Sequence, residues 1–341
     1  MALVGATYAS PVLTDYLVKY TNPDYVGTRA LPFVQVPKLE GKYTVFSKKN
    51  AFKREKTLRP SMSKAGTHDW TTSQETYACE PYAWREFMPY IDYDNAEPPV
   101  QAQMNKIDRC ANTIMLDQEV RINELIFATG TYATAQKMTL TSGGTSDGYQ
   151  FDQYTAGAGT LFSIIETGWS KAFRPPDADA VCLINEETWR IVKHHPDVTA
   201  RITGGATKEA PGTVSLQTFA ELIGADEVLV GRAKYDSTSK QSTQTNAYIW
   251  GRNMLLFYRA RSTSRDATQL GSTFVYNPST TAGTVVQVPG AQNGWRARSY
   301  EDLETGGGGL WTEAEMYADE VVVGADCACL ISACIGDTTP T

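Results

Sequence analysis

The sequence predicts an α+β fold in which one long helix accompanies many short strands. Residues 95–130 form the longest stretch with helical periodicity, whereas several shorter segments alternate polar and apolar residues as strands do. The glycine, threonine and tyrosine content favours strands and turns over a helical bundle. A length of 341 residues allows two domains with a sizeable core, and 42% hydrophobic with 20% charged residues is typical of a soluble globular protein.

The first part of the chain predicts an arm followed by a long hairpin. Residues 1–35 carry apolar residues and prolines without a sustained period, which indicates an extended arm packed on another surface. Residues 36–80 have hairpin character, because segments 42–47 and 69–79 alternate polar and apolar residues. The stretch between them, residues 48–66, is too polar to bury a core. A two-stranded arm of this kind is at most marginally stable alone, so we expect it to need a partner surface.

Residues 95–130 predict a helix of roughly 45 Å, which is longer than a small globular core needs. Asn95 is the predicted N-cap, and Pro98 and Pro99 suit positions that need no amide donor. We interpret this helix as a structural spine, although a long surface helix of an ordinary domain has the same pattern. Apolar residues recur at three- and four-residue steps along one stripe: Val100, Met104, Ile107, Ala111, Ile114, Val120, Leu125 and Ile126.

The rest of the chain predicts an α/β lobe and a return of strands. Thr160, Asn185 and Ser215 are predicted helix caps, and Gly224 is a predicted helix end. The expected helices cover residues 160–173, 185–196 and 215–224, and the expected strands cover residues 179–184, 227–231, 247–250, 255–258, 316–324 and 327–335.

The net charge of −7 argues against a general nucleic-acid coat held by basic patches. Residues 42–64 are nevertheless basic, and their cations could meet nucleic acid or acidic patches on neighbouring subunits. Aromatic residues are not interleaved there as a base-stacking platform needs. We therefore select six of these residues as candidate assembly contacts: Lys48, Lys49, Lys53, Arg54, Lys56 and Arg59.

No catalytic, cofactor-binding or metal site is predicted. His194 and His195 are adjacent, and neighbouring helical positions do not face one another, so they cannot readily share a metal. The acidic string at residues 92–97 lacks the glycine and the distant glutamate of an EF-hand loop. The six cysteines match neither a disulfide framework nor a paired zinc motif, which predicts free thiols. No window approaches about 18 consecutive apolar residues, so no membrane span is predicted.

The order of these parts resembles the major capsid proteins of tailed phages, a fold shared with herpesvirus capsid floors and encapsulins. The resemblance covers nearly the whole chain and rests on no catalytic signature. Several local strings are similar to strings of that family: Asn22-Pro-Asp-Tyr-Val-Gly with Leu31-Pro-Phe-Val-Gln-Val, Trp189 with His195-Pro-Asp-Val, Glu221-Leu-Ile-Gly with Val228-Leu-Val-Gly-Arg, and Ile249-Trp-Gly-Arg-Asn.

The resemblance implies a division of the chain into the parts of a capsid subunit. Residues 1–35 would be the N-terminal arm and residues 36–80 an extended β-hairpin loop that reaches over an adjacent subunit. Residues 81–179 would form a peripheral domain that includes the spine helix, residues 180–290 an axial α/β domain, and residues 291–341 the return to the peripheral domain.

The function that the resemblance implies is non-enzymatic. The chain would self-assemble into pentamers and hexamers of an icosahedral head that encloses double-stranded DNA and contacts it weakly. We expect it in the virion, assembled in the host cytoplasm, with no membrane contact. Expected partners are a portal, a decoration protein and a separate scaffolding protein, the last because arm-like sequence follows Met1 directly. Two alternatives stay open: an encapsulin-like compartment shell, and an α/β enzyme with an unrecognised site.

Overall fold

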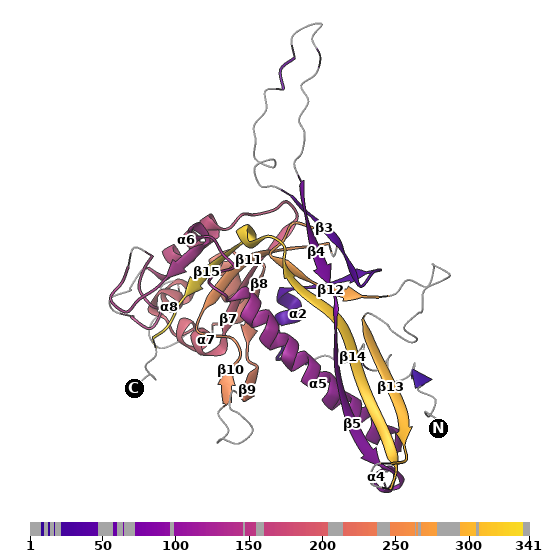
Figure 1. Cartoon of the computed structure of the whole chain (residues 1–341). Coiled ribbons are helices and arrows are strands. Elements are labelled where there is room, and N and C mark those ends of the chain that lie inside the picture. Colours follow the sequence, from indigo (N-terminus) through magenta and orange to yellow (C-terminus); the bar gives the residue numbers. More distant parts are fainter. Residues whose placement is uncertain are drawn as a thin grey trace.

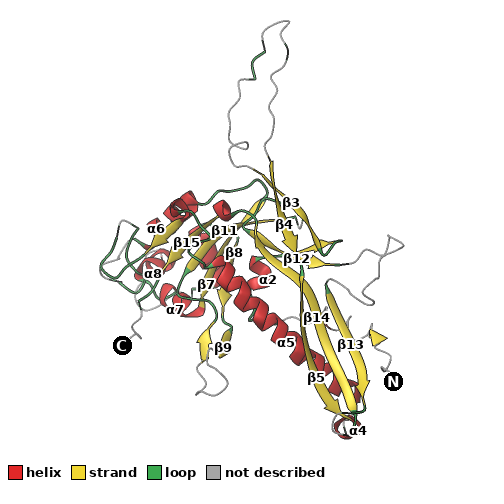
Figure 2. Cartoon of the chain, in the orientation of Figure 1, coloured by secondary structure: helices red, strands yellow, loops and turns green. Residues whose placement is uncertain are grey.

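The computed structural model describes residues 8–9, 13, 17, 22–46, 57–59, 64, 72–95, 99–145, 147–154, 160–203, 214–236, 246–262, 264, 267–277, 294–304 and 307–336. Two main sheets, a long helix that contacts both of them and a two-stranded ribbon at one end make up this part of the chain (Figures 1 and 2). Within it, no helix combines the length and the hydrophobicity that crossing a bilayer requires.

The larger sheet has six strands and draws them from distant parts of the chain. Its order is β1-β13-β14-β12-β2, and β5 pairs with β14 outside this path. Strand β14 therefore has three partners, and it also carries much of the apolar face that the long helix covers. The strands are β1 (Tyr8–Ala9), β2 (Phe33–Val36), β5 (Glu80–Pro89), β12 (Gly271–Tyr276), β13 (Trp295–Asp302) and β14 (Gly309–Val322).

The long helix α5 (Pro99–Ile126) packs across one face of this sheet. It is shorter than predicted at both ends, and Asn95 is not its cap but follows the short helix α4 (Tyr90–Asp94). Consecutive prolines disfavour helical backbone at the residue before each of them, which accounts for the start at Pro99. The shared apolar cluster is Leu13, Leu17, Ile107, Cys110, Ala111, Ile114, Trp295, Ala297, Ala314, Met316 and Ala318.

The second sheet is the centre of the predicted α/β lobe. Its order is β6-β15-β11-β7-β8, and the all-apolar stretches of β7 and β11 lie in its middle, as strands covered on both faces should. The strands are β6 (Lys137–Thr139), β7 (Ala178–Asn185), β8 (Glu227–Gly231), β11 (Met254–Ala260) and β15 (Ala328–Ser332).

Different helices pack against the two faces of the lobe sheet. One face packs against α6 (Leu161–Lys171), α7 (Glu186–Val192), α8 (Pro196–Thr203) and α9 (Leu216–Ile223). The other face packs against the C-terminal part of α5 and the segment that contains α2 (Gly27–Ala30). The long helix therefore contributes to the cores of both sheets, which makes the body of the subunit one connected structure.

Two features of the lobe differ from the sequence-based prediction. The helix capped by Asn185 ends at Val192, and a separate helix, α8, begins at Pro196, because proline suits the first turn of a helix and not its interior. The continuous range 180–290 also does not coincide with the lobe. Strands β6 and β15 and helix α6 lie outside that range but belong to the lobe, whereas β12 lies inside it and joins the larger sheet. A continuous range could not describe the lobe, because its sheet is formed by strands that are far apart in the sequence.

The hairpin predicted around residues 36–80 is present at its base. Strands β3 (Glu40–Phe46) and β4 (Thr72–Ala78) pair antiparallel and extend from the end of the body that lies opposite α4 (Figure 1). A second short ribbon, β9 (Lys234–Asp236) with β10 (Asn246–Tyr248), extends from the lobe. Two short 3₁₀ helices, η1 (Thr134–Gln136) and η2 (Ala325–Cys327), precede β6 and β15.

Candidate assembly surfaces

The base of the β3–β4 ribbon is fixed to the larger sheet by aromatic packing. The rings of Tyr43 and Tyr77 lie 5.4 and 4.9 Å from the ring of Phe274 on β12. Val34, Val36 and Cys79 complete this buried cluster. Tyr43 also donates a hydrogen bond of 2.7 Å to Glu75, and burial raises its pKa, so the hydroxyl remains protonated. The ribbon therefore leaves the body in a defined direction.

Two further contacts hold the ribbon in register. Gly41 faces Tyr77, and a Cβ atom at residue 41 would lie 2.5 Å from the tyrosine oxygen, so no larger residue fits there without a shift. At the end of β4, the backbone N–H of Ala78 donates a 2.8 Å hydrogen bond to Asp319 on β14. The first contact fixes β3 against β4, and the second ties the ribbon base to the central strand of the larger sheet.

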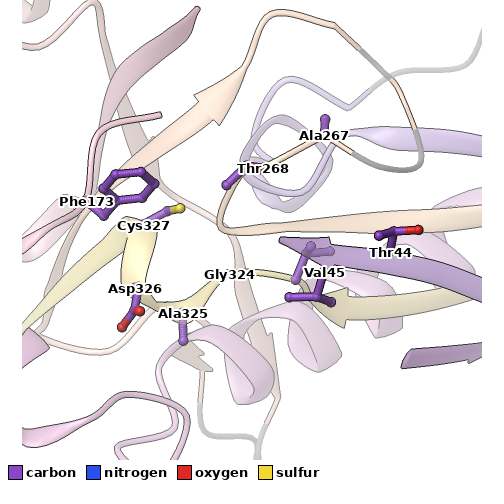
Figure 3. Close-up of a pocket in the computed structure, with 10 residues that line it drawn as sticks. Thr44, Val45, Phe173, Ala267, Thr268, Gly324, Ala325, Asp326 and Cys327 are labelled. Carbon is purple, nitrogen blue, oxygen red and sulfur yellow. The ribbon is translucent and has the colours of Figure 1, made fainter. Parts of the chain in front are cut away.

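A hollow of about 270 Å³ separates the ribbon from the lobe. Thr44 and Val45 line it from the ribbon, whereas Phe173, Asp326 and Cys327 line it from the lobe (Figure 3). The ribbon is thus held by the aromatic cluster and borders open space toward the lobe.

The predicted assembly contacts lie on the chain that connects β3 and β4. Lys48, Lys49, Lys53, Arg54 and Lys56 fall outside the described residues. Arg59 is described and exposed, and so are Lys42 and Lys64 of the same basic stretch. Next to Arg59, the side chain of Leu58 is 92% exposed.

The opposite end of the molecule carries exposed aliphatic side chains of its own. Ile91 on α4 is 73% exposed and Leu303, after β13, is 74% exposed. These two segments are neighbours, because Tyr90 N–H donates to the carbonyl of Gly308, and a Cβ atom on Gly308 would lie 3.1 Å from the Tyr90 ring and 3.5 Å from Leu303. The exposed charged residues around this pair are all acidic: Asp92, Asp94, Glu301 and Glu304. We call these six residues the blade tip.

The face of the larger sheet that points away from α5 carries a ladder of charges. Side chains alternate between the two faces of a strand, so Arg296 and Arg298 point away from the helix while Trp295 and Ala297 point toward it. Each arginine is paired with a glutamate directly across on β14: Arg296 with Glu315, and Arg298 with Glu313. The ladder is internally neutralised, which leaves little net charge on this face for a charged partner.

A buried carboxylate joins three parts of the subunit. Glu119 on α5 is 1% exposed and accepts hydrogen bonds from the backbone N–H groups of Val26 and Gly27, at 2.8 and 2.7 Å. It also accepts a 2.7 Å hydrogen bond from the indole N–H of Trp250. Burial raises the pKa of Glu119, and the three hydrogen bonds oppose that rise. No local sequence pattern indicated this site, because its donors lie some ninety residues before Glu119 and more than a hundred after it.

The described residues contain no group of three or more histidine, cysteine, aspartate or glutamate side chains placed to hold a metal. His195 is buried and accepts a 3.1 Å hydrogen bond from Asp197 N–H, and burial lowers its pKa, so it is a neutral capping residue.

All six cysteines are free and buried, which confirms the prediction of free thiols.

Comparison with known proteins relates this chain to phage capsids. The major capsid protein of Pseudomonas phage JBD67 is 25% identical over 295 residues, which cover 86% of this chain and 91% of that protein. The chain is a homologue of phage major capsid proteins. A second homologue, the major capsid protein of Burkholderia phage BcepMu, is 25% identical over 258 residues and covers 73% of this chain and 75% of its own length. No protein-family model matches the chain.

Solved structures show the same capsid fold. A phage-related protein from Bordetella bronchiseptica RB50 matches with a TM-score of 0.69 at 15% identity, covering 96% of this chain and 98% of that one. The capsid of cyanophage P-SCSP1u matches with a TM-score of 0.52 at 12% identity, covering 97% of this chain and 89% of that one. The fold is thus the α+β capsid fold that the sequence indicated, and together with the homologues it gives the chain a structural role in a capsid.

Proposed function

We propose that the chain forms the shell of an icosahedral phage head, assembling into pentamers and hexamers around double-stranded DNA. The observation that carries this proposal is the match to two phage major capsid proteins along most of the chain, combined with the capsid fold. Because both homologues come from phages, they favour a virion over an encapsulin-like compartment. Assembly would take place in the host cytoplasm.

The proposed role is non-enzymatic. The chemistry that a shell needs is the burial of complementary surfaces between identical subunits. The ribbon fits this role because it projects from the body while its base is firmly packed. The six basic residues on its connecting chain, Lys48, Lys49, Lys53, Arg54, Lys56 and Arg59, are proposed as contacts between subunits.

The parts of the subunit take proposed roles accordingly. The lobe would pack around the five-fold and six-fold axes, and the larger sheet with α5 would form the peripheral part. Residues 1–35 would act as the arm, although residues 22–36 also pack into the body through α2 and β2. A scaffolding protein, a portal and a decoration protein stay proposed partners, and DNA is proposed to touch the acidic shell only weakly.

Electron microscopy of the full-length protein tests the proposal. The chain is expressed in bacteria, purified and imaged in negative stain, while sedimentation velocity gives the size of the particles. Closed shells or rings of five and six subunits are the expected result. Protein that stays monomeric at every concentration would contradict the shell proposal.

A further inference from the structure

Strand β5 leaves one edge of the larger sheet open. Residues 309–316 of β14 pair with β13 on one side and with β5 on the other, so these two strands flank β14 (Figure 1). Within the described part of the chain, β5 has no second partner strand. We infer that the β5 edges of two subunits pair antiparallel across a two-fold axis. This inference rests on the proposed shell function and names a contact that joins neighbouring rings.

The pairing of β5 with β14 fixes which backbone groups face the open edge. Tyr90 N–H donates a 3.1 Å hydrogen bond to the carbonyl of Gly308, and residues 80–89 continue this register along residues 309–318. Hydrogen-bonded and non-hydrogen-bonded pairs alternate along an antiparallel ladder. Even-numbered residues of β5 therefore bond to β14, whereas the N–H and C=O groups of its odd-numbered residues point outward.

The open edge offers three backbone donors between two prolines. The outward N–H groups belong to Ala83, Arg85 and Phe87. Pro81 and Pro89 occupy the other odd-numbered positions of β5 and have no N–H group. Proline on an edge strand blocks pairing, but here the two prolines lie at the ends and leave the middle of the strand open. Ala83 and Arg85 are also exposed, so a second strand can reach them.

The side chains of β5 select the register of the pair. Registers centred on Trp84, Arg85 or Glu86 each give every outward N–H group an acceptor within β5. Centring on Arg85 or Glu86 places like charges directly opposite one another, which destabilises a strand pair. Centring on Trp84 places Arg85 opposite Ala83 of the second copy. Glu86 then lies opposite Tyr82, so neither charge meets its like.

Trp84 fits the centre of this pair. Its side chain is 51% exposed, although Trp84 pairs with Ala314 of the buried cluster under α5. Trp84 is therefore on the helix side of the sheet, where a hollow of about 330 Å³ is lined by Trp84, Thr113 and Ile114. Trp84 of the second copy lies directly opposite and can enter this hollow. The aromatic cross-strand pair and the burial of both indole rings stabilise the contact.

The symmetry of the contact suits the joining of rings. Rings of five or six subunits close through head-to-tail contacts between two different surfaces. Pairing of β5 with its own copy is isologous instead, so one surface of each subunit links two rings. A strand of another protein would meet the same backbone donors, but the match of Trp84 with itself favours a second copy of this chain.

Cysteine cross-linking of assembled full-length protein tests the pairing. In Trp84→Cys, the two new thiols lie in a non-hydrogen-bonded pair with Cα atoms about 4.5 Å apart, which suits a disulfide. Oxidation with copper phenanthroline is expected to give a two-chain band on a non-reducing gel that returns to one chain on reduction. The six native thiols are buried and contribute little background. Glu80→Cys is the matched control, because this exposed position of the same strand lies about 26 Å from its copy.

Removing one outward donor tests the role of the pair in assembly. Ala83→Pro deletes the N–H group that meets the carbonyl of Arg85 in the second copy, so each contact loses two hydrogen bonds. Proline is accepted on an edge strand where the N–H faces solvent, and a thermal melt checks the fold. We expect Ala83→Pro to need about ten-fold more protein to close shells in sedimentation, while rings persist. Ala83→Ser keeps the donor and should assemble like wild type.

The possible results separate the contact from the shell function. Particles in which Trp84→Cys links no better than Glu80→Cys would overturn the contact, and so would a folded Ala83→Pro variant that closes shells like wild type. Cross-linking of Arg85→Cys in place of Trp84→Cys would overturn the register centred on Trp84. All of these results would leave the shell function intact, whereas wild-type protein that never assembles would contradict that function itself.

Discussion

The carboxylate of Glu119 satisfies three N–H groups that would otherwise lie buried without an acceptor. These donors belong to the segment at α2 and to the lobe, whereas Glu119 belongs to α5. An added Cβ atom on Gly27 would lie 2.6 Å from the carboxylate, so glycine allows this close approach. Glu119 thus links segments that lie far apart in the sequence.

Replacing Glu119 by alanine should destabilise the subunit by about 3–5 kcal/mol, because three buried donors lose their acceptor. Glu124→Ala on the exposed side of α5 is the control and should change stability by no more than about 0.5 kcal/mol. Denaturant midpoints of unassembled protein measure both, since assembly masks subunit defects by mass action. Equal effects of the two substitutions would contradict the role assigned to Glu119.

Because the pKa of Glu119 is raised in the folded subunit, the contribution of this residue to stability depends on pH. A raised folded pKa means that its contribution to stability is greatest when the carboxyl is protonated. That contribution falls as pH rises from the unfolded value, about 4.3, through the raised folded value. Glu119→Gln cannot titrate, so wild type should gain stability relative to this variant as pH falls through the same window. Denaturation at several pH values measures the difference, and a constant difference would contradict the raised pKa.

The cysteines should be unreactive in the folded subunit. Burial raises the pKa of Cys110 and Cys329 to about 11 and that of Cys79 and Cys182 to about 12. Because the thiolate is the reactive form, a thiol reagent at neutral pH should label native protein very slowly. Denatured, unreduced protein should release all six thiols, and a count below five would contradict the free state.

The apolar stripe of α5 should carry most of the stability that this helix contributes. Ile114 is 4% exposed and packs in the cluster between the helix and the larger sheet, so Ile114→Ala should cost about 2–5 kcal/mol. Asn105→Ala, on the exposed side, should cost no more than about 0.5 kcal/mol. Lys106 is a poor control, because it forms a 3.3 Å ion pair with Glu86 on β5. Denaturant midpoints that fall equally in both alanine variants would contradict the buried-stripe account.

Elements with local signals were predictable, and elements defined by distant partners were not. Helix α9 matches its prediction because Ser215 accepts from Thr218 N–H and Gly224 adopts the left-handed conformation, and both signals lie in the local sequence. Strand β5 was missed because half of its side chains are exposed and only Met88 is buried, and because its pairing with β14 spans more than two hundred residues. The basic stretch was visible as a run of residues, whereas the blade tip forms only when residues 90–95 meet residues 301–304.

Deleting residues 48–66 should separate folding from assembly. This polar segment has no core of its own, while the ribbon base is held by the cluster around Phe274. We expect the deletion variant to keep its secondary structure in circular dichroism and to lose its large particles in sedimentation. Normal particles from this variant would contradict the assignment of the ribbon to subunit contacts.

The position of the last strands has a consequence for the order of events during synthesis. Strand β14 occupies the centre of the larger sheet, and β15 lies between β6 and β11 in the lobe sheet. Both are made from residues 309–332, which follow all the other strands of the two sheets in the sequence. Neither sheet can therefore close until these residues have left the ribosome. Because domains fold as units, a nascent subunit should be unable to join a neighbour before residues 309–332 have been made, which restricts growth of the assembly to chains that contain both strands.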